Sequence, residues 1–265
     1  MEEIFPRLKR GKMIIATKDG PKDSRSDVLF TNSYLGPYVL QKPAYWEKLI
    51  GMLYGEGRLR NFASVVEDIV EKFSFLALAK DQIAEHEKTR DPRKRFFVQY
   101  FVYSYIFMTK SFLDATAVFI NESYGLGFNG GDIDLIRGKF IESLKAKNRP
   151  LAQKITEKQN WIRLVVTYRN NLIHKHGLYV GPIPTVPEEI TDPREVDQFI
   201  LKEPHYIPHD PHLLIDHVYD GVEGEFIKVA SFVEEWIHES FEVFDIVLGS
   251  FTASFELVPR EEGSR

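Results

Sequence analysis

Residues 96–108 read FFVQYFVYSYIFM, the longest apolar and aromatic run in the chain. The run lies inside residues 93–124, which contain neither glycine nor proline. Such a stretch predicts one long helix, and its apolar residues occur on nearly all faces of that helix. At 13 residues the run is shorter than the roughly 20 that a membrane span requires, and basic residues flank it. We therefore expect a helix that is buried on more than one side, with another copy of the protein as its second cover, and no membrane segment.

The periodic patterns on both sides of this helix predict an all-α fold, a bundle of four long helices with a short extra helix. We expect helices over residues 44–54, 58–88, 92–124, 132–147, 151–176 and 224–248. Residues 1–57 are predicted to be an irregular N-terminal extension, residues 58–248 the helical bundle, and residues 249–265 a tail. Residues 178–223 contain nine glycines and prolines and are predicted to be a long loop insert before the last helix. Residues 125–130 read GLGFNG, but this G-x-G-x-x-G follows a helix and predicts a loop, not a dinucleotide site.

The composition limits the class of protein. The 265 residues are 43% hydrophobic and 28% charged, which is typical of a folded protein and excludes a largely disordered chain. The chain has no cysteine, which excludes a disulfide scaffold, thiolate zinc fingers, iron–sulfur clusters and cysteine nucleophiles. The N-terminus has no apolar secretory segment, and we expect a cytoplasmic location.

A basic block lies within the acidic chain. Residues 137–175 hold ten Lys and Arg against two Glu, a net charge of +8, whereas residues 176–265 have a net charge of −14. Such a block is typical of a site for an anionic ligand. Within it we expect Lys145, Lys147 and Lys154 to contact RNA. The alternatives are a solvated helix face and pairing with the acidic C-terminal part of the chain.

The sharpest motif ends this block, where residues 168–177 read YRNNLIHKHG. Arg169 is followed by the polar Asn170 and, after four intervening positions, by His174. This order resembles the signature of the HEPN superfamily, the higher-eukaryote and prokaryote nucleotide-binding domains. Residues 110–117, KSFLDATA, are also similar to the helix that precedes the motif helix in this superfamily. The resemblance covers about residues 58–248, with the insert outside the usual core.

The resemblance implies a metal-independent endoribonuclease, without a cofactor, that acts as a homodimer in which two motifs face one cleft. It further implies a place in a toxin–antitoxin, abortive-infection or RNA-processing system, with an antitoxin protein as a possible partner. In the superfamily toxins that are silenced by nucleotide addition, a tyrosine stands two positions after the histidine. The chain has His176 there, so we do not expect that form of regulation.

The chemistry of the residues agrees with this reading. RNA cleavage by its own 2′-hydroxyl needs a proton acceptor, a proton donor and a cation for the charged phosphorane, and it leaves a 2′,3′-cyclic phosphate. His174 is the expected general acid/base, Arg169 the phosphorane-stabilising cation, and Asn170 an orienting residue, while Lys175 and His176 are expected to bind RNA. On a regular helix a five-residue step places Arg169 and His174 about 140° apart. Both can reach one phosphate only if the helix unwinds or two chains contribute.

Three alternatives remain at the level of sequence. The same dimer can be a non-catalytic module that binds RNA or a nucleotide, or a scaffold. The histidines of the insert, His205, His209, His212 and His217, can serve a metal-dependent hydrolase, although their spacing matches no helical ligand pair. Finally, Arg169 and His174 can simply cap their helix and pair with acidic residues of the last helix.

Overall fold

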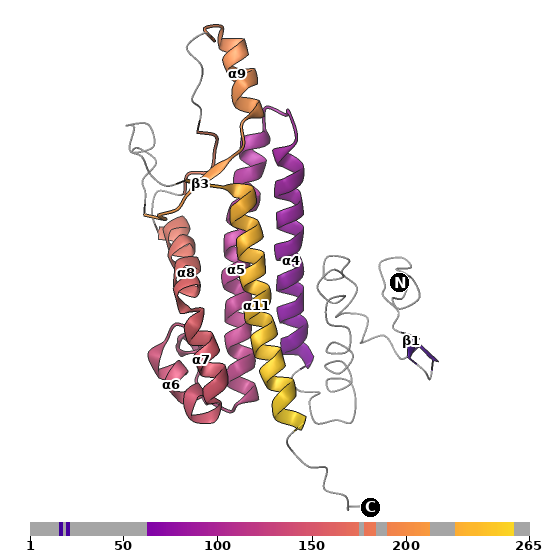
Figure 1. Cartoon of the computed structure of the whole chain (residues 1–265), viewed down its shortest axis with the longest axis vertical. Helices are drawn as coiled ribbons and strands as arrows, with labels where there is room; N and C mark the ends of the chain where they lie inside the picture. The colour runs from indigo at the N-terminus through magenta and orange to yellow at the C-terminus, as the bar shows by residue number, and fades with distance from the viewer. Residues whose placement is uncertain are drawn as a thin grey trace, which may run out of the picture. The chain divides into compact units, whose positions relative to one another are not determined.

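The computed structural model describes residues 16–17, 20–21, 63–174, 178–183, 190–212 and 226–256. Over these ranges the fold is all-α, as predicted, with two small sheets (Figure 1). The helices are α4 (Ala63–Glu87), α5 (Lys94–Ser123), α6 (Gly138–Lys147), α7 (Arg149–Glu157), α8 (Gln159–His174), α9 (Pro193–Lys202) and α11 (Val229–Glu256). None of these described helices has the length and apolarity of a membrane span.

Both sheets are antiparallel pairs of short strands. β1 (Ala16–Thr17) pairs with β2 (Gly20–Pro21), and these residues are the only described part of the predicted N-terminal extension. The helix predicted over residues 44–54 lies outside the described residues. β3 (Tyr206–Pro208) pairs with β4 (Phe226–Lys228), and β4 leads directly into α11.

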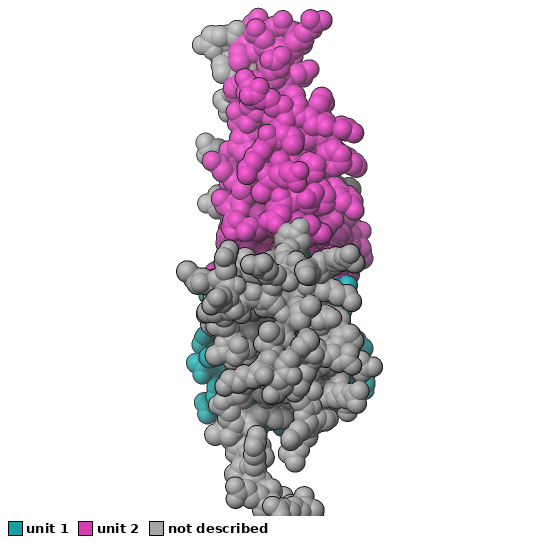
Figure 2. Space-filling view, turned by 90° about the vertical axis from the view of Figure 1, so that its right-hand side faces the viewer, with its two compact units in different colours: residues 1–74, 112–159, 242–265 teal, residues 75–111, 160–241 magenta. Residues whose placement is uncertain are grey.

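The chain divides into two compact units, coloured separately in Figure 2. Unit 1 comprises residues 1–74, 112–159 and 242–265, and unit 2 comprises residues 75–111 and 160–241. In unit 1 the rings of Phe73 and Phe244 stack with centroids 6.1 Å apart, and Phe112 packs against both. Unit 1 also contains α6 and α7, whose buried residues occur every three or four positions, as an amphipathic helix requires.

Unit 2 packs around aromatic side chains from three helices. Tyr168 of α8 meets Trp236 of α11 edge-on, with centroids 5.4 Å apart, and Phe232 packs against both. Tyr105 of α5 is fully buried, and its hydroxyl donates to the carbonyl of Val233 at 2.9 Å. These contacts join α8 and α5 to α11, and so they fix the helix that carries the motif within unit 2.

Local signals set both ends of α5. The side chain of Asp91 accepts the backbone N–H of Arg93 at 2.8 Å, and Pro92 between them has no N–H to satisfy. At the other end Gly125 has a φ of +58°, and the N–H of Leu126 bonds the carbonyl of Asn121. This is a Schellman ending, in which a glycine takes the left-handed conformation. The three glycines of the GLGFNG segment all have positive φ, so the predicted loop is confirmed.

The helix α5 is predicted to be buried on more than one side, and one of its faces remains exposed in the described part of the single chain. Along one face of the helix Phe96 is 67% exposed, Tyr100 57% and Phe107 36%. These residues lie within about 40° of one another around the helix axis. We call them the α5 stripe. Among the residues that the structure describes, none covers this stripe fully, whereas the opposite positions, such as Val98 and Val102, are buried.

Two predicted helix boundaries are wrong. The helix expected from residue 132 begins at Gly138, because the Asp134 side chain accepts the N–H of Ile136 at 3.1 Å and so forms a turn that competes with the helix. The helix expected over residues 151–176 is divided at Lys158, whose N–H bonds the carbonyl of Ile155 and whose ammonium pairs with Glu242. The predicted end of this helix, His176, lies outside the described residues.

The insert and the last helix also differ from the prediction. The insert is not wholly a loop, since it contains α9 and β3; Asp192 caps α9 by accepting the N–H of Arg194 at 2.8 Å. The last helix begins at Val229 because the preceding residues pair as β4, and it extends to Glu256, into the predicted tail. The division of the chain into an extension, a bundle and a tail stays a prediction.

Candidate functional site

The buried face of α8 is held by side-chain hydrogen bonds to the insert. Tyr168 is 1% exposed, and its hydroxyl donates to the carbonyls of Pro208 and His209, the latter at 3.0 Å. Asn171 is 4% exposed, and its amide donates to the carbonyl of Pro211. Since Tyr168 and Asn171 are one turn apart on the same face, the segment 208–211 runs along α8 beside the motif.

The motif itself occupies the remaining faces of α8. Asn170 and His174 are exposed and Arg169 is partly exposed. Nη1 of Arg169 donates to Oδ1 of Asn170 at 3.1 Å. The helix continues through His174 without unwinding, so Arg169 and His174 lie about 140° apart around its axis, and Asn170 and His174 about 40° apart. Within one chain, this regular helix does not bring Arg169 and His174 onto one face.

The predicted RNA-binding lysines belong to the other unit. Lys145 and Lys147 lie in the last turn of α6, and Lys154 lies in the last turn of α7. All three are exposed, and Nζ of Lys145 is 3.5 Å from a carboxylate oxygen of Glu142. The motif is part of unit 2, whereas these lysines are part of unit 1. The other two predicted RNA-binding residues, Lys175 and His176, lie outside the described residues.

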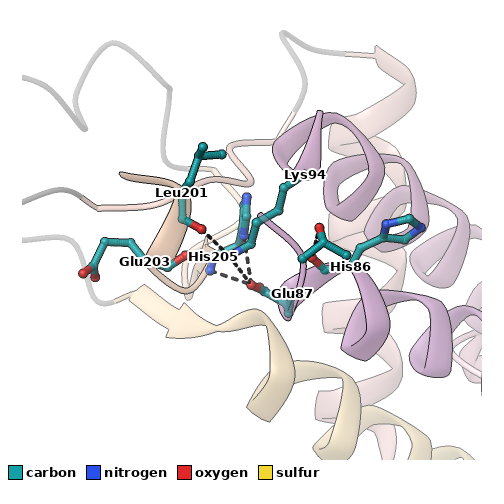
Figure 3. A network of polar contacts seen from close by, with 7 residues as sticks. His86, Glu87, Lys94, Leu201, Glu203 and His205 are labelled. Atoms are coloured by element: carbon teal, nitrogen blue, oxygen red, sulfur yellow. Dashed lines mark hydrogen bonds and ion pairs between the residues drawn. The ribbon is translucent and has the colours of Figure 1, made fainter. Parts of the chain in front are cut away.

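A buried polar network lies at His205, three residues before the insert segment 208–211 that contacts α8 (Figure 3). Glu87 ends α4, and its carboxylate is 3.0 Å from the backbone N of His205 and 3.1 Å from Nδ1 of the same residue. Lys94 begins α5; its Nζ is 3.4 Å from that carboxylate and donates to the carbonyls of Leu201 and Glu203. Lys94 and His205 are each 2% exposed, so this is a buried charge network that joins three segments distant in sequence.

The network sets the ionisation of Glu87. Burial acts to raise the pKa of this carboxyl group, but the hydrogen bonds and charge of His205 together with the charge of Lys94 outweigh burial. The pKa of Glu87 therefore lies below its ordinary value of 4.5, and the carboxylate is the form that the fold stabilises.

The pKa of Tyr168 shifts in the opposite direction. Burial, with smaller contributions from the negative charges of Asp210 and Glu235, raises the pKa of this phenol far above its ordinary value. The hydroxyl therefore keeps its proton and remains the donor in the hydrogen bonds that hold α8 to the insert.

The histidines of the insert do not gather as the metal-dependent alternative requires. His205 is bound to Glu87, whereas His209 and His212 are exposed, and His217 lies outside the described residues. Over the described ranges no group of three or more His, Asp or Glu residues is placed to hold a metal ion. This part of the chain therefore supplies no ligand set for that alternative.

The motif is visible in the sequence, but the residues that support it are less evident. A signal for Tyr168 and Asn171 is present, because with the buried Ile162 and Val165 they form a row of three-residue steps along α8. No local signal relates Glu87 to His205, because the two residues are 118 positions apart and meet only through the tertiary fold.

Comparison of the chain with protein-family models, curated proteins and solved structures finds no significant match. The likeness to the HEPN superfamily therefore depends on Arg169, Asn170 and His174 and on the similarity of residues 110–117.

Replacing Glu87 should reveal the buried network through the pH dependence of stability. At pH 7, Glu87→Gln should lower the free energy of unfolding by about 3 kcal/mol, because it leaves the charge of Lys94 buried without its anionic partner. Since the pKa of Glu87 is depressed, its contribution is complete above about pH 4.5 and is lost as the pH falls through the lower folded pKa. Urea unfolding from pH 7 to pH 3 measures both effects.

Glu85→Gln is the matched control, because Glu85 is exposed and its carboxylate accepts a hydrogen bond from the nearby Gln82 amide on the same helix. Its stability should stay close to that of the wild type. A difference between wild type and Glu87→Gln that stays constant down to pH 3 would contradict the assignment.

Proposed function

We propose that the protein is a homodimeric, metal-independent HEPN-type endoribonuclease. The observation that carries the proposal is that one face of α8 is buried and held by hydrogen bonds, whereas the motif residues lie on its accessible faces. Tyr168 and Asn171 fix the buried face, while Arg169, Asn170 and His174 stay accessible at the end of the helix.

The chemistry assigned to these residues is transesterification by the 2′-hydroxyl of RNA. In this reaction His174 transfers protons, and Arg169 stabilises the negative charge that grows on the phosphorane. Asn170 accepts a hydrogen bond from Arg169, so it is suited to orient the guanidinium. The expected products carry a 2′,3′-cyclic phosphate and a 5′-hydroxyl.

The dimer is the second part of the proposal. Because Arg169 and His174 of one chain diverge around α8, each cleavage site combines Arg169 of one chain with His174 of the other. The α5 stripe supports an interface between copies, because three large aromatic side chains in a row are otherwise left in contact with water. Ile173, directly before His174, is also 43% exposed and adds apolar surface beside the motif.

The remaining parts of the proposal rest on charge and on the resemblance. The exposed lysines of α6 and α7 are proposed to bind the RNA backbone, with Lys175 and His176 as further contacts. A role in a cytoplasmic toxin or defence system, with an antitoxin protein as partner, follows from the resemblance alone.

A non-catalytic dimer is the second candidate, and the α5 stripe favours it equally, since an apolar surface suits a scaffold or an RNA-binding module as well as an enzyme. Incubation of the purified protein with mixed RNA in EDTA separates the two candidates. Cleavage supports the ribonuclease, and binding without cleavage supports the module.

Charge reversal should test the role of the basic block. The triple variant Lys145→Glu, Lys147→Glu, Lys154→Glu should bind RNA more weakly and reduce the slope of log K against log salt by about 2–3, because fewer counterions are released. Fluorescence anisotropy at several salt concentrations measures this slope. Lys88→Glu, an exposed charge reversal in unit 2, should leave it unchanged. An unaltered affinity in the triple variant would assign these lysines to a solvated helix face.

The α5 stripe should determine the oligomeric state. Light scattering should show a dimer for the wild type at micromolar concentration and a monomer for Phe96→Glu, Tyr100→Glu, because two charges would be buried at the interface. Ala84→Glu adds a charge at an exposed position of α4 and should stay dimeric. A wild-type monomer, or a dimer that survives the double substitution, would count against this interface.

Substitution of the motif should abolish cleavage. His174→Ala and Arg169→Ala should each lower the cleavage rate by a factor of about 10²–10⁴ in EDTA while the fold persists. His176→Ala should have a smaller effect, and His238→Ala, an exposed histidine of α11, should have none. End-group analysis of the products identifies the reaction. Wild-type cleavage by both primary variants would place the activity at another site.

A further inference from the structure

We propose that residues 205–212 of the insert form a positioning strap for the motif helix, and that Glu87 and His205 act on the cleavage site through this strap. The inference rests on the proposed function for its kinetic readout, while its structural readout, the exchange of backbone amides, is independent of that function.

At one end the strap fixes the rotation of α8 about its axis. Tyr168 and Asn171 bond carbonyls of Pro208, His209 and Pro211 from positions three residues apart on one helix face. Two such bonds, separated by one turn, prevent the helix from rolling relative to the strap. The direction in which the intervening motif residues point therefore depends on where the strap lies.

The strap itself has few ways to move. Pro208 and Pro211 have restricted φ angles and present carbonyls without an N–H of their own. Between them, the side chain of Asp210 accepts the N–H of His212 at 2.8 Å and closes a turn. β3 pairs with β4, which places Pro208 opposite Phe226. The strap is thus a short segment with few free dihedral angles and with hydrogen bonds along its length. A shift at the His205 end is therefore expected to move the carbonyls that Tyr168 and Asn171 bind.

At the other end the strap is anchored through His205 (Figure 3). The backbone N–H and Nδ1 of His205 both meet the Glu87 carboxylate, and the His205 carbonyl accepts the N–H of Val229 at the start of α11. Lys94 holds the preceding residues by donating to the carbonyl of Leu201, in the last turn of α9, and to that of Glu203, directly after the helix. Loss of the Glu87 charge would remove the shared partner of His205 and Lys94.

The strap also holds the chain that follows the motif. Gly181 and Tyr206 exchange two backbone hydrogen bonds, of 3.2 and 2.8 Å, and the carbonyl of Leu178 accepts the hydroxyl of Tyr103 at 2.6 Å. The motif is therefore held from both sides, by Tyr168 and Asn171 before its end and by residues 178–181 after it. A displacement of about 1 Å in a catalytic group can lower a rate by about 10²-fold. Loss of the contacts on either side of the motif should therefore lower kcat.

The test compares Glu87→Gln, Tyr168→Phe and the double variant with wild type, and Glu85→Gln serves as the matched control. Hydrogen exchange measured by mass spectrometry follows the amides of residues 205–212 and 169–174. Cleavage kinetics of the full-length protein supply kcat and KM. Tyr168→Phe keeps the ring that packs on Trp236 and removes only the hydroxyl, so it remains informative if Glu87→Gln folds poorly.

Both single variants should speed the exchange of residues 169–174 and lower kcat by about 10–10²-fold, with KM little changed. The kcat of the double variant should be no lower than that of the more severe single variant. Once the strap is released at Glu87, the hydrogen bonds of the Tyr168 hydroxyl no longer fix the position of α8. Glu85→Gln should match the wild type in both measurements.

Independent, additive effects of Glu87→Gln and Tyr168→Phe would overturn the strap. Faster exchange confined to residues 205–212, with residues 169–174 unchanged, would also overturn it. If the wild type cleaves no RNA, the proposed function fails, and the exchange pattern alone still decides whether the strap positions the helix.

Discussion

The hydrogen bonds from Tyr168 and Asn171 to the carbonyls of residues 208–211 are the constraint on which the candidate site depends. A phenol hydroxyl and an amide buried in an apolar core cost about 1–3 kcal/mol each if they find no acceptor. α11 covers the ring of Tyr168, so the acceptors come from the insert, whose carbonyls lie along α8. The insert is thus part of the structure that holds the motif, although the resemblance to the HEPN superfamily places it outside the usual core.

The buried charges of unit 2 also need partners inside the protein. Glu87, Lys94 and His205 would be costly to bury singly, and together they provide partners for one another and for two backbone carbonyls. Such a network adds little net stability compared with apolar packing, but it requires one geometry. Here that geometry joins the ends of α4 and α5 to the segment that supports α8.

Much of the helical architecture could be predicted from local patterns. Apolar residues spaced three and four positions apart indicate the buried face of α4, and a long stretch without glycine or proline indicates α5. The Asp91–Pro92 signal predicts the start of α5 to within two residues, whereas the same signal at Asp192–Pro193, the start of α9, lies among prolines that favour a loop. The break at Lys158 has no local signal, since the buried positions on both sides keep one helical period. For the site, Arg169, Asn170 and His174 are visible as a motif, whereas the contact between Glu87 and His205 arises from packing that no local pattern encodes.

The central claim is that each cleavage site uses Arg169 of one chain and His174 of the other, and subunit mixing tests it most directly. Arg169→Ala and His174→Ala proteins, each inactive alone, are mixed, allowed to exchange subunits, and assayed for RNA cleavage in EDTA. In a two-fold dimer one of the two sites of each mixed dimer regains both residues, so the mixture should recover about a quarter of wild-type activity. Exchanged mixed dimers that recover no activity would contradict the account and would place the reaction within a single chain or outside this motif.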